Sequence, residues 1–78
     1  MPRYFFDICD DIVSTDEDGL DLADEDAARA EALRGARDLI CEQVRNGRIN
    51  LGHRIEVLDE ARRPVLTLTF GAAVEIER

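Results

Sequence analysis

The chain has 78 residues and a net charge of −8 at pH 7, with 18 aspartates and glutamates against 10 arginines. We therefore expect one small domain over residues 1–78, too small for a deep substrate cleft, and no non-specific nucleic-acid binding, which depends on neutralising phosphates. No apolar run approaches the roughly 18 residues of a membrane span and no signal-peptide pattern is present, so we expect a cytoplasmic protein without a membrane partner.

The first predicted element is a strand over residues 3–9, RYFFDIC, which is rich in aromatic and β-branched residues. Strand alternation places Tyr4, Phe6 and Ile8 on one face, and Phe5 and Cys9 on the other. Because three of the four aromatic residues of the chain lie in this segment, we expect the strand to be central in its sheet.

An acidic loop over residues 10–19 follows the first strand, and residues 19–22 can form a short second strand that returns alongside it. Residues 1–26 contain ten carboxylates and one arginine, a local charge of −9, whereas residues 27–78 have a charge of +1. This concentration of charge suggests a basic protein as one possible partner.

The spacing in the acidic loop partly matches an EF-hand calcium loop. With Ser14 at the first position, Asp16, Asp18 and Glu25 occupy the third, fifth and twelfth positions. However, serine replaces the first acidic ligand, Asp21 occupies a position that is normally hydrophobic, and a strand precedes the loop where an EF-hand has a helix. We therefore interpret the loop as a solvated acidic turn and keep weak calcium binding as an alternative.

Residues 24–45 are predicted to form one long helix, because they are rich in alanine, leucine, arginine and glutamate and contain no proline. Asp24 is the expected N-cap, and Gly47 supplies the residue that ends the helix. Gln43 projects near the apolar stripe at one end of the helix, where we expect its tip to reach water. The stripe itself has helical spacing and consists of Ala28, Ala32, Leu33, Ala36, Leu39, Ile40 and Val44.

A glycine-containing connection over residues 46–53 leads into a hairpin, whose strands we predict at residues 54–58 and 65–70. His53 is expected to be an ordinary surface residue of the connection, and residues 74–78 to be a short tail strand or a frayed end. The hairpin residues expected to face the helix are Ile55, Val57, Leu66, Leu68 and Phe70.

The predicted fold is therefore α+β in the order β-β-α-β-β, with the helix packed on one face of an antiparallel sheet of three to four strands. The opposite face carries Phe5, Leu58 and Val65, which one helix cannot cover, so these three are candidates for an exposed apolar interface. We expect a homodimer through this face or through a projecting helix end. The alternative is a monomer with scattered exposed apolar residues.

Residues that could support catalysis are few. Ser14 and His53 are the single serine and the single histidine, and both lie in predicted loops, so we expect no Ser–His–Asp arrangement. Cys9 lies on a strand and Cys41 on the helix side away from the stripe, which predicts two free thiols and no zinc site. The chain has no phosphate-binding or dinucleotide-binding motif. We expect neither an enzyme nor a bound cofactor.

The segments MPRYFFDI, DEDG, LADEDAARAEALRGARDL and RIEVLDEARRPVLTLTF together resemble a family of short uncharacterised alphaproteobacterial proteins. Those proteins have an MPRYFF-like strand, an acidic DxxG turn, an AAxxEAL helix and an IEVxDExGxxVLTxxF hairpin. The resemblance covers nearly the whole chain and implies a domain of unknown function without a known activity. This chain has Asp7 where that family often has histidine, which weakens any metal or catalytic role of that position, and Arg63-Pro64 where a glycine turn is usual.

A weaker likeness, at the level of the fold, is to HicB-type antitoxins, which run from strands through an acidic DG turn into a helix with alanines on its sheet side. Their PxxPG element before the helix and their DNA-binding segment have no counterpart here. We consider three functions: a non-catalytic cytoplasmic interaction or regulatory module that self-associates, an antitoxin-like acidic partner of a small basic protein, and a weak calcium-binding module.

Overall fold

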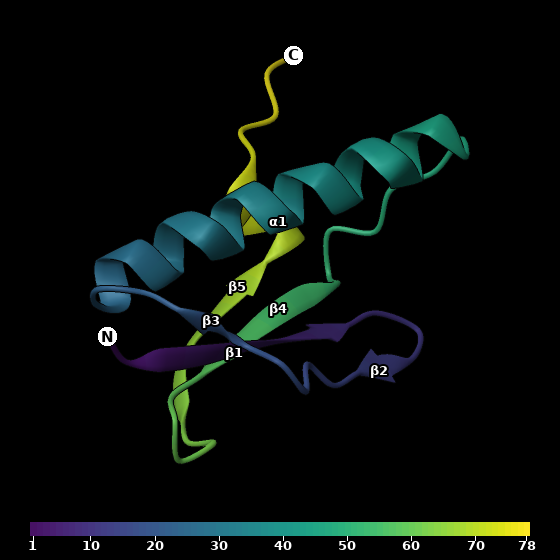
Figure 1. Cartoon of the computed structure of the whole chain (residues 1–78). Helices are drawn as coiled ribbons and strands as arrows, with labels where there is room; N and C mark the ends of the chain where they lie inside the picture. The colour runs from purple at the N-terminus through teal and green to yellow at the C-terminus, as the bar shows by residue number, and fades with distance from the viewer.

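A long helix lies across one face of an antiparallel sheet in the computed structural model, which describes residues 1–78 (Figure 1). The strand order is β2-β1-β4-β5, and β3 pairs with the other end of β1. The predicted α+β class and the helix on one face of the sheet are confirmed. The elements are β1 (Arg3–Cys9), β2 (Val13–Ser14), β3 (Leu20–Asp21), α1 (Glu25–Arg45), β4 (Arg54–Leu58), β5 (Pro64–Thr69) and α2 (Phe70–Ala73).

The strand β1 has neighbours on both sides, as predicted for a central strand. It pairs with β4 from Phe5 opposite Leu58 to Cys9 opposite Arg54. On its other side the two ends of β1 pair with β2 and β3, which are only two residues long. The strand β3 was expected from the sequence, but residues 10–19 were expected to form a loop, so β2 is an addition to the predicted fold.

The helix α1 begins and ends where its sequence predicts. The Asp24 carboxylate accepts a hydrogen bond of 2.9 Å from the Ala27 N–H, which caps the first turn. After Arg45 the chain leaves the helix through Gly47, whose φ of 84° is readily adopted by glycine. The helix packs closely on the sheet because the side chains at the contact are small, and Ala28, Ala32 and Ala36 are fully buried.

The end of the helix differs from the prediction. Val44 belongs to the predicted inward stripe but is 59% exposed, because α1 extends beyond the ends of β4 and β5 (Figure 1). Below this overhang the connection folds back, and His53 is buried with its ring edge-on to Phe70. The prediction of His53 as a surface residue is therefore wrong.

Gln43 holds this connection and does not simply reach water as predicted. Its side-chain oxygen accepts a hydrogen bond of 3.0 Å from the Asn50 N–H, so its amide nitrogen is the donor toward His53 Nδ1 at 2.8 Å. It follows that Nδ1 is an acceptor and that the proton of the neutral ring is on Nε2. The half-buried Gln43 side chain thus joins the helix end to the connection through two hydrogen bonds.

The last strand is one residue longer at its start than predicted and ends earlier. β5 begins at Pro64, and the Thr69 hydroxyl accepts a hydrogen bond of 3.2 Å from the Ala72 N–H, which caps the short helix α2. Phe70 therefore opens α2, although its predicted place in the core is correct because it is 1% exposed. Residues 74–78 form no strand.

The core lies between α1 and the hairpin of β4 and β5. Val57 and Phe70 are its largest fully buried side chains, and Ile55 and Leu68 pack beside them. Phe6 and Ile8 also point to the helix side of the sheet, but they are only half-buried. Neither helix combines the length and the apolar composition that a membrane span requires.

Candidate functional site

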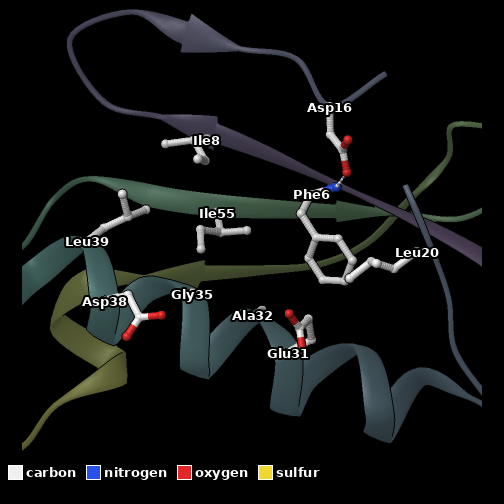
Figure 2. A pocket seen from close by; sticks show the side chains of 10 residues that line it. All are labelled: Phe6, Ile8, Asp16, Leu20, Glu31, Ala32, Gly35, Asp38, Leu39 and Ile55. Carbon is white, nitrogen blue, oxygen red and sulfur yellow. Dashed lines mark hydrogen bonds between the residues drawn. The ribbon is translucent and has the colours of Figure 1, made fainter. Parts of the chain in front are cut away.

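An apolar groove runs between α1 and β1 (Figure 2). It exists because α1 packs mainly on β4, β5 and α2 and hardly touches β1. The groove has a volume of about 330 Å³. Its sheet side is formed by Phe6, Ile8 and Ile55, and its helix side by Ala32, Gly35 and Leu39.

The floor of the groove explains why part of β1 stays half-buried. Phe6 and Ile8 face the helix but stay half-buried, because the groove separates them from α1. Leu20 from β3 closes one end of the groove and remains 44% exposed. Apolar side chains of another molecule could bury this surface and gain about 25 cal/mol for each Å² of apolar area removed from water.

Gly35 lies on the helix side of the groove and adds no side chain to it. A glycine inside a helix destabilises it by roughly 0.5–1 kcal/mol relative to alanine. A Cβ at this position would lie 3.6 Å from the Ile55 side chain, an ordinary van der Waals contact. The fold therefore does not need glycine here for close packing. The sequence analysis did not select Gly35, although a glycine inside a helical pattern is a recognisable signal.

The rim of the groove is acidic. Glu31 and Asp38 project from α1, and Asp16 approaches from the strand side (Figure 2). Arg34 forms an ion pair with Glu31, whereas Asp38 takes part in no ion pair of this structure. The groove thus combines an apolar floor with a negatively charged border, an arrangement that suits an apolar segment carrying positive charges.

Asp16 has a second role at the edge of β1. Its carboxylate accepts hydrogen bonds from the N–H groups of Phe6 at 3.0 Å, Gly19 at 3.1 Å and Asp18 at 3.2 Å. Partial burial acts to raise the pKa of Asp16, but these main-chain donors, together with the charge of Arg62, lower the pKa below its ordinary value. The carboxylate therefore holds the acidic loop against β1.

The four residues of the possible calcium loop do not come together. Asp16 is committed to main-chain donors, Ser14 and Asp18 are exposed, and Glu25 lies in the first turn of α1. No group of three or more histidine, cysteine, aspartate or glutamate side chains converges as a metal ion requires. The spacing along the sequence matches an EF-hand only in part, and the fold does not turn it into a ligand cage.

The predicted apolar interface on the opposite face is largely covered. Phe5 and Leu58 are direct neighbours across β1 and β4, but Leu58 is only 9% exposed. The guanidinium of Arg62 lies 3.8 Å from the centre of the Phe5 ring, and Val65 packs against the core cluster. The expectation that these three residues form an exposed patch is therefore wrong, and their role as an interface remains a prediction.

The groups considered for covalent chemistry form no hydrogen bonds with one another. Burial and the nearby Glu56 carboxylate raise the pKa of the Cys9 thiol, which favours its neutral form. Cys41 is exposed on α1, and both thiols are free. His53 accepts a hydrogen bond from Gln43, and its Nε2 is buried without a hydrogen-bond partner, 3.6 Å from an oxygen of Asp11.

Comparison with known proteins gives a family without an assigned activity. Curated proteins and solved structures gave no match. The model of one family, described as a domain of unknown function (DUF6894), matches residues 3–71, which include every strand, α1 and the groove. The chain therefore belongs to the DUF6894 family, in agreement with the sequence resemblance to an uncharacterised domain.

Proposed function

We propose that this chain is a non-catalytic interaction module that binds a basic protein in the groove between α1 and β1. The observation that carries the proposal is Gly35, which lowers helix stability and adds no side chain to the groove, although the packing would accept alanine. Natural sequences retain such a destabilising residue where function needs it. We expect the module to act in the cytoplasm, because it has two free thiols.

The chemistry of the groove defines the partner. A volume of 330 Å³ is near the lower limit of small-molecule sites, which span about 300–1,000 Å³. An open groove of this kind suits a few apolar side chains of an amphipathic segment. Lysine or arginine residues beside those side chains would reach Asp38 and Glu31 at the rim. The net charge of −8 would also accelerate association with a basic partner.

The role of an antitoxin-like partner is one form of this proposal, since a small basic toxin would supply such a segment. The proposal concerns the site and the chemistry of its partner, and it does not depend on that particular role. It also needs no catalytic group, because binding would rest on apolar burial and charge complementarity alone.

A direct test uses a fluorescent synthetic peptide of leucine and lysine residues arranged with helical periodicity. We expect saturable binding to the full chain, measured by fluorescence anisotropy at physiological salt. The double substitution Glu31→Gln and Asp38→Asn should weaken binding about tenfold, since the two rim charges on α1 are lost. Gly35→Leu should abolish binding, because its side chain would occupy the groove.

The matched control is the pair Glu75→Gln and Glu77→Gln, which changes the net charge by the same amount in the exposed tail. This variant should bind the peptide as the wild type does. Equal losses in both double variants would show that the peptide responds only to overall charge. That result, or unchanged binding by the Gly35→Leu variant, would contradict the proposed function.

A further inference from the structure

The two sides of the sheet differ in how the main-chain groups of their strands are used. On β1 the N–H groups of Tyr4, Phe6 and Ile8 point away from β4, because the Phe6 N–H donates to Asp16 and alternate residues of a strand point the same way. Tyr4 pairs with β3 and Ile8 pairs with β2. Every outward N–H along this stretch of β1 therefore faces a partner within the chain.

The edge formed by β5 has no such cover. The Phe70 N–H donates to the His53 carbonyl at 2.8 Å, so by alternation Leu68 and Leu66 direct their main-chain groups to β4, and Thr67 and Thr69 direct theirs outward. The Thr69 hydroxyl caps α2 by accepting a hydrogen bond from the Ala72 N–H. The Thr69 N–H and both main-chain groups of Thr67 are left without a partner in the chain.

The two sides of the sheet also differ in charge. Residues 1–26, with a charge of −9, form β1, its short neighbours and the acidic loop, at one side of the sheet. The strand β5, PVLTLT, contains no charged residue and lies at the other side. Charges and covering loops are the means by which proteins protect sheet edges from association. Here they protect the β1 edge, while β5 is left open.

We propose that two copies of this chain associate by pairing β5 antiparallel with β5, with Thr67 of each copy at the two-fold axis. In this register the two Thr67 residues exchange two hydrogen bonds. The half-buried Leu66 of one copy lies opposite Leu68 of the second copy on the helix side. Pro64 and the irregular pairing at Val57 and Leu58 confine the ladder to the second half of β5.

A second copy fits this edge better than an unrelated strand does. Antiparallel pairing about Thr67 places leucine opposite leucine and Thr67 opposite Thr67, so the edge is complementary to itself. The two exposed Thr67 side chains form a cross-strand pair on the face away from α1. The acidic segments of the two copies lie at the far edges of the joined sheet, where their mutual repulsion is smallest.

The test is the mass of the full chain in solution, measured by sedimentation equilibrium over a range of micromolar concentrations. We expect the wild type to approach twice the chain mass of 8.8 kDa. Thr67→Pro removes the outward N–H and leaves the β4 ladder intact, so it should raise the dissociation constant about thirtyfold, the effect of losing two hydrogen bonds. Thr67→Val keeps the N–H and should remain dimeric.

Thr67→Lys provides a second variant that needs no change of the backbone, because the side chain is exposed. It places like charges opposite each other at the two-fold axis and should also give a monomer. A wild type that remains at 8.8 kDa, or a dimer unchanged by Thr67→Lys, would overturn the proposal. If the Phe5→Asp variant is a monomer while the Thr67→Lys variant remains a dimer, the interface lies on the sheet face opposite α1. Peptide binding in the groove is measured separately, so the two proposals can fail independently.

Discussion

Arg62 is a single residue that combines backbone strain with a covering role. Its φ of 64° lies in the left-handed region, one residue before the Arg63-Pro64 pair. Glycine adopts this region without the steric cost that a side chain adds, so the backbone at residue 62 has a conformation that favours glycine. In this chain the strained arginine donates to the Asp16 carbonyl at 2.9 Å and covers the Phe5 ring. The side-chain contacts offset the unfavourable backbone conformation.

The backbone strain and the side-chain contacts of Arg62 have opposite effects on stability, and together they predict the order of stability of its alanine and glycine variants. Arg62→Ala loses the contacts and keeps the strain, which should lower the free energy of unfolding by about 1–2 kcal/mol. Arg62→Gly loses the same contacts but removes the strain, so it should be more stable than the alanine variant by about 1 kcal/mol. Urea unfolding of the three proteins measures this order. A glycine variant less stable than the alanine variant would show that the backbone at residue 62 is not strained.

Asp16 predicts how stability depends on pH. The pKa of Asp16 is lower in the folded protein than its ordinary value of 3.8. Its contribution to the free energy of unfolding is therefore complete above pH 3.8 and is lost as the pH falls through the lower pKa of the folded protein. Asp16→Asn should reduce the free energy of unfolding at pH 7 by about 1–3 kcal/mol. Both carboxylate oxygens accept hydrogen bonds from main-chain N–H groups, whereas an amide has only one oxygen that can accept. The difference between wild type and variant should shrink below pH 3.8.

The control for this experiment is Asp18→Asn, which changes the same charge on a neighbouring exposed residue whose side chain forms no hydrogen bond. Denaturant unfolding at neutral and acidic pH should show little effect of this substitution. If Asp16→Asn behaves in the same way, the carboxylate does not hold the loop against β1.

At the scale of elements, the end of α1 depends on the connection that folds beneath it. Gln43 satisfies both the Asn50 N–H and the buried His53 Nδ1. Gln43→Ala leaves these groups without partners and should lower the free energy of unfolding by about 1–3 kcal/mol. Glu42→Ala, at the adjacent exposed position, should change it by less than about 0.5 kcal/mol. Thermal unfolding followed by circular dichroism compares them, and equal effects would contradict the bridging role.

The helices and strands could be predicted where the preferences of neighbouring residues determine them. Composition and the Asp24 cap define α1, and the run RYFFDIC defines β1. Phe70 was placed correctly in the core by alternation, but its helical conformation depends on the Thr69 cap, which the strand pattern obscured. The position of His53 could not be predicted, because it depends on how far α1 overhangs the sheet and where the connection returns.

At the scale of the whole molecule, the sequence indicated a single α+β domain but not where its open surfaces lie. Amphipathicity shows that α1 covers a sheet, yet it does not show that α1 packs mainly on β4 and β5 and leaves Phe6 and Ile8 of β1 half-buried. The groove arises from this lateral offset. The apolar character of Phe5, Leu58 and Val65 suggested an exposed face, but a long arginine side chain and strand pairing cover much of it.

The central claim is that the groove is kept open for a partner at the expense of helix stability. Gly35→Ala should therefore raise the free energy of unfolding by about 0.5–1 kcal/mol and the melting temperature by roughly 2–8 °C. The decisive measurement is the affinity of the same variant for the leucine–lysine peptide, compared with that of the wild type under identical conditions. The account predicts binding weakened severalfold in the more stable protein. Equal or tighter binding by the Gly35→Ala variant would contradict it.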